Sequence, residues 1–346
     1  FFLSRLYLLF GHEPLAGAVA NIFLSLAISF LSYLIARRVF DEKTARWTAL
    51  IMLFFPSQIL FVNLLASEMV FTPLFLLSIL MILIAVERLR GRWWLLLAGG
   101  VALGLATLTR GLTQVYWLLL VPVFYMRTRS RSKTARDTIL MLLGFTVVVT
   151  PWILRNHHAV GRARTSTNGG INFMIGNNPA SGMGWIEVDT VEFNTHDATL
   201  EAYIDSVGWQ RGWAYIKAHP LRFFKRGLLK VGYLYAGDLT GIHYQFSQAA
   251  ENDRLDWSVL VALISQGYYI MVLLFGALGL IAYVRYRDCR SPGGYLLWMT
   301  ILFWTAVHFV FFGHARFHFP IMPMISALTA LFIVRTVNLQ KDKPTC

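Results

Sequence analysis

Nine long apolar runs divide the sequence and limit what it can fold into. About 20 apolar residues in a helix cross the ~30 Å hydrocarbon core of a bilayer. Backbone groups in lipid must be paired within the segment, and the runs are far longer than barrel strands, so they predict helices. Only 14% of the residues are charged, against about 25% in soluble proteins. We therefore predict an all-α polytopic membrane protein with about nine transmembrane helices, near residues 17–36, 46–63, 69–86, 93–109, 112–126, 137–154, 259–284, 294–312 and 319–336.

Basic residues are concentrated in every second connection between these runs. Of the 31 Lys and Arg residues, 18 lie in the alternate connections 37–46, 87–92, 126–137, 285–290 and 335–343. The intervening short connections carry almost none, which is the positive-inside pattern. The basic connections are then cytoplasmic and the remaining connections face outward. Because the net charge of +13 follows membrane topology, it indicates contacts with anionic membrane lipids and no nucleic-acid partner.

The longest polar stretch, residues 155–258, predicts an outward-facing soluble domain between the sixth and seventh spans. We expect three parts: a six-span bundle over 1–154, an α+β outer domain over 155–258 and a three-span bundle over 259–346. Within the outer domain, the Gly/Asn-rich stretch 160–195 predicts turns and short extended pieces, and 196–235 predicts helix. The segment "HPLRFFKRGLLKVGYLY" mixes four cations with aromatic residues, which suits an amphipathic helix on the outer membrane surface.

Lone ionisable groups stand at the outer ends of several spans. They are Glu68, Arg110, Arg155 and Arg316, with Asn156 and His318 next to two of the arginines. Ionisable groups at a membrane boundary are costly and suggest a binding site. Three arginines with one carboxylate predict a cationic site for an anion such as phosphate, which arginine binds through paired donors. The alternatives are snorkelling side chains at helix ends and simple charge pairs.

Arg155 leaves the membrane through the stretch "VVVTPWILRN". Here Pro151 and Trp152 predict a turn and an interfacial anchor that would aim Arg155 at the mouth of the outer domain.

His314 and His318 are weak metal-ligand candidates because they lack a ligand spacing. Glu187 and Asp189 resemble an acid-x-acid metal site, although this pattern is more typical of a solvated strand edge. The residues thus identify no cofactor, and a divalent metal ion stays open.

Five segments together resemble the polyprenyl- or dolichyl-phosphate-sugar glycosyltransferases. This GT-C superfamily branch includes the protein O-mannosyltransferases and the aminoarabinose transferases. The segments are, in order, "LFGHEPLAGAVANIFLSLAISFLSYLIARRVF", "ASEMVFTPLFLL", "ATLTRGL", "TPWILRN" with "STNGGINFMIGNNP", and "ARFHFPIMPMISALTA". The last has Phe317 where the family commonly has tyrosine.

The resemblance implies an inverting transfer of a hexose or pentose from a lipid phosphate to a lipid, glycan or protein acceptor. A carboxylate would act as base, and cations or a metal would stabilise the departing phosphate. Arg110, Arg155 and Arg316 would face the donor phosphate, supported by Asn156, His318 and Trp152. The family's base lies in a first outer loop, so we expect it upstream of Phe1 in a truncated, inactive chain. Glu68 and Glu13 are the alternative candidates within the sequence.

A transporter or flippase for a lipid-linked or anionic substrate is the alternative function. Transporters commonly show inverted repeats and helices broken near the midplane, whereas the charges in this sequence lie at outer span ends and no repeat is evident. A structural subunit is a third class, but it has little need for several arginines at span ends. The sequence thus favours an integral membrane glycosyltransferase of a bacterial or archaeal cell membrane.

Overall fold

The computed structural model describes residues 2–11, 13–87, 91–179, 198–246, 255–285 and 291–341. The regular structure within these residues is helical, and no β-strand occurs among them. The first part of the chain forms α1 (Phe2–Phe10), α2 (Pro14–Val39), α3 (Glu42–Leu53), α4 (Pro56–Leu60), the 3-10 helix η1 (Phe61–Asn63), α5 (Ser67–Glu87), α6 (Trp93–Thr109), the 3-10 helix η2 (Gly111–Val115), α7 (Trp117–Thr128) and α8 (Arg131–Val160).

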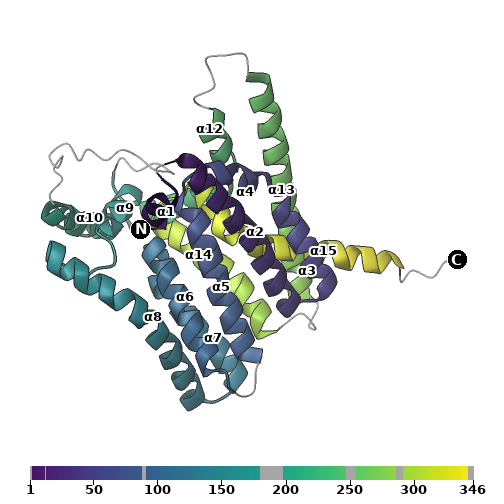
Figure 1. Ribbon diagram of the computed structural model, residues 1–346, viewed down its shortest axis with the longest axis horizontal. Helices are drawn as coiled ribbons and strands as arrows, with labels where there is room; N and C mark the ends of the chain where they lie inside the picture. The colour runs from purple at the N-terminus through teal and green to yellow at the C-terminus, as the bar shows by residue number, and fades with distance from the viewer. Residues whose placement is uncertain are drawn as a thin grey trace.

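The second part adds four α-helices beyond the sixth predicted span, and then three α-helices and one 3-10 helix that return to the bundle (Figure 1). They are α9 (Gly169–Gly176), α10 (Ala198–Ala218), α11 (Pro220–Tyr235), α12 (Thr240–Phe246), α13 (Leu255–Arg285), α14 (Pro292–Val310), the 3-10 helix η5 (Ala315–Ile321) and α15 (Met322–Lys341).

Six described helices are long and apolar enough to cross a membrane, which makes this an integral membrane protein. A seventh span results if α3 and the α4–η1 segment, which meet at a 48° bend, are counted together. The runs predicted near 93–109 and 112–126 form the shorter apolar helices α6 and α7. Each of the nine predicted runs thus lies in one helix or in consecutive helical segments, but length and composition support six or seven spans.

Two spans lie at the centre of the bundle. In α5, 72% of the apolar window is buried inside the protein, and in the span Ala315–Thr336 the value is 89%, against 28–33% in the other candidate spans. Around α5, rings of Phe71, Phe75, Tyr116 and Trp304 contact one another with centroids 4.9–6.1 Å apart. The Tyr116 hydroxyl lies 2.6 Å from the Thr300 hydroxyl, so the polar tip of this buried ring is satisfied. Dense packing therefore holds the N-terminal half of α5 in place within the bundle.

Small residues bring α6 and α8 into close contact. A side chain at Gly100 would collide with the backbone of Met141 and Phe145, and one at Gly144 would collide with the backbone of Leu97. Gly104 lies on the same side of α6, facing Phe145 and Val148. The small-xxx-small spacing of Gly100 and Gly104 is typical of such packing. This contact fixes α8, the helix that carries Arg155, against the bundle.

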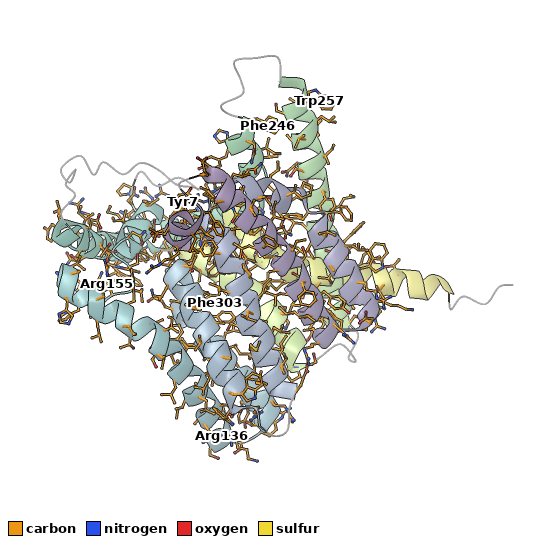
Figure 2. All side chains as sticks on the ribbon, viewed as in Figure 1. Tyr7, Arg136, Arg155, Phe246, Trp257 and Phe303 are labelled. Carbon is orange, nitrogen blue, oxygen red and sulfur yellow. The ribbon has the colours of Figure 1, made fainter. Side chains whose placement is uncertain are left out.

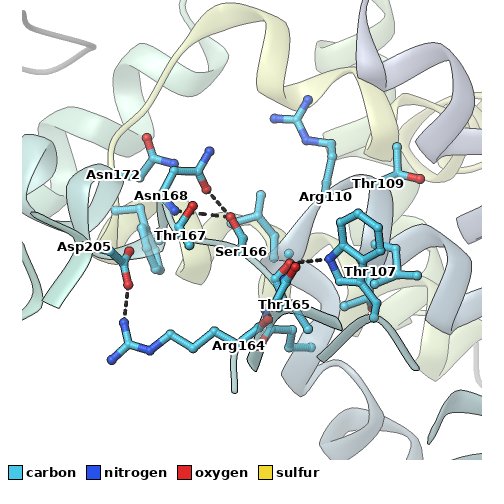
Figure 3. Close-up of a pocket in the computed structure, with 18 of the residues that line it drawn as sticks. Thr107, Thr109, Arg110, Arg164, Thr165, Ser166, Thr167, Asn168, Asn172 and Asp205 are labelled. Atoms are coloured by element: carbon cyan, nitrogen blue, oxygen red, sulfur yellow. Dashed lines mark hydrogen bonds and ion pairs between the residues drawn. The ribbon is translucent and has the colours of Figure 1, made fainter. Parts of the chain in front are cut away.

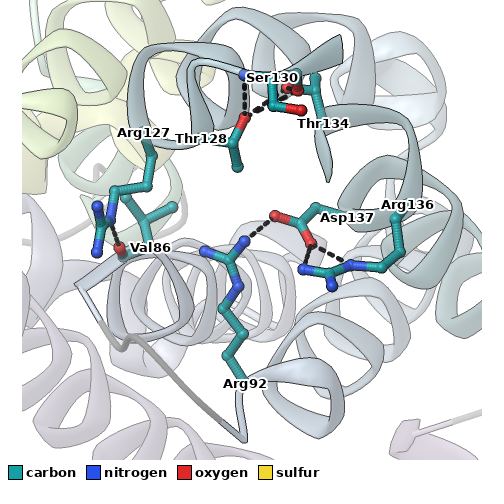
Figure 4. A network of polar contacts seen from close by, with 8 residues as sticks. All are labelled: Val86, Arg92, Arg127, Thr128, Ser130, Thr134, Arg136 and Asp137. Carbon is teal, nitrogen blue, oxygen red and sulfur yellow. Dashed lines mark hydrogen bonds and ion pairs between the residues drawn. The ribbon is translucent and has the colours of Figure 1, made fainter. Parts of the chain in front are cut away.

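Basic connections meet at the end of the bundle opposite Arg155, where Figure 2 labels Arg136. Asp137, 1% exposed, forms ion pairs with Arg92 and with Arg136, the latter at 3.0 Å. Arg127 donates from Nε to the carbonyl of Val86 at 2.6 Å (Figure 4). The connections 87–92 and 126–137 are therefore joined by the Arg92–Asp137 pair at one end of the bundle.

Two local predictions are wrong. The helix α8 does not turn at Pro151 but continues through it to Val160 and ends at Gly161, whose φ is +67°. Proline kinks a helix without ending it when the remaining hydrogen bonds persist.

Residues 169–176 are also helical, because Phe173, Met174 and Ile175 bury one face. The helix predicted over 196–235 is found from 198 as α10 and α11. The predicted extended pieces do not occur in the described residues of 155–258, and residues 180–197 lie outside the description.

Candidate functional site

Glu68 joins two of the predicted arginines at the end of the central spans. It stands in the first turn of α5, Arg110 caps the C-terminus of α6, and Arg316 lies in η5. The Glu68 carboxylate, 1% exposed, forms an ion pair with Arg110, and the same oxygen lies 3.5 Å from Arg316 Nε. Arg110 and Arg316, which lie 42 and 248 positions after Glu68 in the sequence, therefore form one charged group with it, whose net charge is +1.

The Phe317 ring supports both guanidinium groups. The Cζ atoms of Arg110 and Arg316 lie 4.9 Å and 5.1 Å from the ring centroid. Arginine on an aromatic face is stabilised by the ring's negative π-face. The Phe317 side chain is buried at the start of the last span, so it fixes where the two cations lie.

Arg155 lies on the last turns of α8, beside the other two sequence-predicted residues of this helix. Its Cζ lies 4.7 Å from the Trp152 ring centroid, and its Nη1 donates to Asn156 Oδ1 at 3.0 Å. Asn156 Nδ2 donates to the carbonyl of Arg164 at 2.8 Å, and Trp152 Nε1 donates to that of Thr165 at 3.0 Å. Trp152 and Asn156 thus tie the following loop to α8, and they orient Arg155.

A cavity of about 1350 Å³ brings these groups together. On the membrane side its wall includes Arg110, Arg155 and Arg316, and on the other side it includes the 163–169 segment and residues of α9 and α10. Figure 3 shows Arg110 across the open space from Asn168 and Asn172. The lining comprises Ser67, Thr107–Leu112, Gln114, Val115, Trp152, Ile153, Arg155, Asn156, Ala159, Val160, Ala163–Gly169, Asn172, Glu201, Asp205, Trp209, Val307, His308, Phe311, Phe312, Arg316 and Phe317.

Charge is distributed unevenly between the two walls. On the membrane side, Arg110, Arg155 and Arg316 exceed the single buried carboxylate of Glu68. On the opposite wall, Arg164 is paired with Asp205, and Glu201 is a further carboxylate. The cavity can therefore hold an anion at its membrane side and a neutral, hydroxyl-rich or cationic group at its outer side.

The Arg164–Asp205 pair is part of the site that sequence reasoning missed. Asp205 is 1% exposed and pairs with Arg164 (Figure 3). It also accepts a hydrogen bond of 2.5 Å from the Gly170 amide. A side chain at Gly170 would collide with the Asp205 carbonyl, so glycine is required for α9 to approach α10. The available signal was the "NGG" stretch, because glycine often marks close backbone approach.

Three predicted residues do not line the cavity. His318 is completely buried, with Nδ1 2.9 Å from the Leu234 carbonyl and Nε2 3.3 Å from Asp238 Oδ1, and it does not line the cavity. Glu13 is exposed at the start of α2, also away from the lining. Glu68 is enclosed by the two guanidinium groups of Arg110 and Arg316 and also lies outside the lining.

The described residues offer no set of metal ligands. No group of three or more His, Cys, Asp or Glu side chains gathers within the part of the chain that the structure describes, and Glu187 and Asp189 lie outside it.

Burial lowers the pKa of His314, and the Arg316 charge lowers it further. His314 Nδ1 accepts a hydrogen bond from the Arg316 amide at 3.3 Å. His314 thus stabilises the η5 turn that carries Arg316.

Comparisons with known proteins find similarity in both sequence and fold. Residues 1–154 match the family of dolichyl-phosphate-mannose-protein mannosyltransferases. Among solved structures, the oligosaccharyltransferase AglB of Archaeoglobus fulgidus, in complex with an inhibitory peptide and a dolichol-phosphate, matches 98% of this chain with a TM-score of 0.56 and 16% identity. The chain shares the fold of this oligosaccharyltransferase. The resemblance predicted from the five sequence segments is confirmed.

Two further matches extend the comparison. The A. fulgidus oligosaccharyltransferase in complex with Zn and sulfate matches 98% of the chain with a TM-score of 0.55 and 13% identity. ArnT from Cupriavidus metallidurans, bound to undecaprenyl phosphate, matches 97% of this chain and 66% of its own, with a TM-score of 0.42 and 16% identity. The search of curated proteins finds no match. The chain spans 40–42% of the length of the two oligosaccharyltransferase chains.

Proposed function

We propose that this protein binds a polyprenyl-phosphate sugar in the cavity and takes part in transferring the sugar to an acceptor on the outer face of the membrane. The observation that carries the proposal is the convergence of Arg110, Arg155 and Arg316 on one wall. A guanidinium binds phosphate oxygens through paired, charge-assisted hydrogen bonds. Polyprenyl phosphates are anions held at the membrane surface, which is where the ends of α6, α8 and η5 lie under the proposed topology.

The cavity is large enough for more than a phosphate. Its 1350 Å³ exceeds the ~300–1,000 Å³ of ordinary ligand pockets. The donor phosphate would occupy the arginine wall, leaving the wall with Asn168, Asn172 and Glu201 for the sugar or the acceptor. With the arginine wall at the outer membrane surface, the region 155–258 would face away from the cytoplasm, between bundles formed by 1–154 and 259–346. The AglB structure with dolichol-phosphate supports the lipid class, because it has the same fold.

The transfer places most of its new negative charge on the phosphate. The acceptor oxygen or nitrogen forms a bond to the anomeric carbon while the bond from that carbon to the phosphate oxygen breaks. The electron pair goes to the phosphate, and the acceptor proton goes to a base. Cations already fixed at the departing phosphate stabilise the transition state without reorganising. In this scheme Arg110 and Arg316, held by Glu68 and Phe317, and Arg155, held by Asn156, stabilise the leaving group.

The transport alternative has one structural feature to consider, the bend between α3 and α4. Broken helices form substrate sites in many transporters. Here, however, the bend is at Phe54 and Phe55, and neither residue is ionisable. The bend therefore does not favour transport of an anion.

Binding of undecaprenyl phosphate to the purified protein in nanodiscs tests the phosphate site without requiring an acceptor or a base. A hydrogen bond involving a charged group contributes about 1.5–3 kcal/mol. Arg155→Ala should therefore weaken binding by roughly 10- to 150-fold, measured by native mass spectrometry. Arg46→Ala is the matched control, because this exposed arginine pairs with Glu42 on α3, away from the cavity. Equal affinities for the wild type and Arg155→Ala would refute the phosphate role of Arg155.

A further inference from the structure

Helix α11 carries five large apolar side chains outward. It is not one of the candidate spans, yet five large apolar residues on it are 39–80% exposed. A helix at a water-exposed protein surface shows the opposite pattern, with apolar residues turned to the core. The outward set, called here the α11 apolar face, comprises Leu221, Phe224, Leu228, Leu229 and Tyr233.

Two of the four cations of α11 point inward. Arg226 donates to the carbonyls of Asn178 and Pro179 at 2.6 Å and 3.0 Å, and to the Tyr215 hydroxyl at 2.8 Å. Lys230, completely buried, lies 3.2–3.4 Å from three oxygens, namely Asn177 Oδ1 and the carbonyls of Phe309 and Val310. Inward polar groups that are this well bonded fix the rotation of the helix. The α11 apolar face thus cannot turn inward without breaking these bonds.

The helix packs against the end of a membrane span. Rings of Phe223 and Phe224 lie 5.5 Å and 5.7 Å from the ring of Phe309, which is in the last turn of α14. A side chain at Gly227 would collide with the Phe309 ring, so glycine permits this approach. Because α14 is a candidate span, α11 lies at the depth where that span ends.

Charge on the outward side complements a phospholipid surface. Arg222 and Lys225 are exposed and lie among the residues of the α11 apolar face. Long cationic side chains reach from an apolar surface to lipid phosphates, and anionic lipids attract them. An aqueous environment would explain these two cations but not the apolar residues around them.

We propose that α11 lies in the outer interface of the bilayer, with the α11 apolar face in the acyl-chain boundary and with Arg222 and Lys225 at anionic headgroups. The inference is independent of the proposed catalytic function. It assigns a lipid-binding surface to a helix outside the membrane-spanning set. It also fixes the cavity next to the headgroup layer, because α11 and α9 meet at Lys230 and Asn177.

Site-directed fluorescence in nanodiscs tests this placement. In a background with Cys289→Ser and Cys346→Ser, bimane is attached at Leu228→Cys or at the control position Arg211→Cys, an exposed residue of α10. We expect bimane at 228 to be quenched by lipids with a doxyl group near the headgroup, and bimane at 211 by aqueous iodide. Strong iodide quenching at 228 would overturn the proposal. Protection of 228 from both quenchers would also overturn it, by indicating a protein partner or a second copy.

The preference for anionic lipid has its own test. Quenching at 228 is compared for doxyl-labelled phosphatidylglycerol and phosphatidylcholine at low salt, with and without Lys225→Gln. We expect about twofold stronger quenching by phosphatidylglycerol and loss of that difference in Lys225→Gln, which is exposed and should not affect folding. Equal quenching by both lipids in the unsubstituted background would contradict the headgroup contact.

Discussion

Titration of Lys230 should make folding stability rise with pH. Its side chain is buried against three neutral oxygens, and burial together with the nearby Arg226 charge lowers the pKa of Lys230 from 10.5 to about 8. The unfolded chain keeps the higher pKa and therefore binds the proton more tightly than the folded chain. The destabilisation is fully present below about pH 8 and disappears as the pH rises towards 10.5.

The expected size follows from the two pKa values. With 10.5 in the unfolded state and about 8 in the folded state, the protonated amine costs about 3 kcal/mol at pH 7 and about 1.4 kcal/mol at pH 9.5. The wild type should thus gain about 2 kcal/mol of unfolding free energy relative to Lys230→Met over this interval. Thermal unfolding in detergent, followed by tryptophan fluorescence at both pH values, should show a relative shift on the order of 3 °C.

Lys225→Met is the matched control, because Lys225 is an exposed lysine on the same helix. Its melting temperature should follow the wild-type pH dependence. The reasoning fails if wild type and Lys230→Met change in parallel between pH 7 and pH 9.5, since Lys230 would then titrate equally in the folded and unfolded chains.

Two further substitutions test the contacts around the cavity. Glu68→Gln leaves the Arg110 and Arg316 charges without their carboxylate, so unfolding free energy in detergent should fall by about 3–5 kcal/mol. The control Glu42→Gln removes a carboxylate from exposed ion pairs, so it should lower unfolding free energy by about 1 kcal/mol or less. Equal losses for the two variants would contradict the argument that the Glu68 pairs are buried. Asp205→Asn removes the charge that holds Arg164 and the Gly170 amide, so amide hydrogen exchange in α9 should accelerate at least tenfold, while unchanged exchange would show that packing alone holds α9 on α10.

The apolar helices and the clustering of arginines on one cavity wall could be predicted from local signals, whereas the count of nine spans was not confirmed. Apolar runs identify helices wherever the surroundings are lipid, since the backbone has no other way to pair its polar groups. Ionisable residues at the outer ends of these runs, such as Glu68, Arg110 and Arg316, then have to meet in a narrow layer. Their convergence follows from topology, whereas their shared ring, Phe317, depends on a side-chain orientation that the sequence does not specify.

The missed features depend on contacts between distant segments. Arg164 and Asp205 are 41 residues apart, and nothing in either local pattern indicates that they pair. Lys230 was grouped with the other cations of α11, but the close approach of α11 to α14 at Gly227 turns it inward. The turn predicted at Pro151 was wrong because local propensity was given more weight than the packing of α8 along α6.

The unbroken course of α8 through Pro151 has a mechanical consequence for the cavity. Proline supplies no amide hydrogen, so the helix lacks one backbone hydrogen bond there and bends more easily at that point than elsewhere. The portion before it is clamped at Gly144 by close packing with α6, whereas Trp152, Arg155 and Asn156 lie just beyond it. Arg155 therefore lies on the short helical segment after Pro151, whereas Arg110 and Arg316 lie at the end of α6 and in η5. A bend at Pro151 would therefore move Arg155 relative to Arg110 and Arg316 and change the width of the cavity between them.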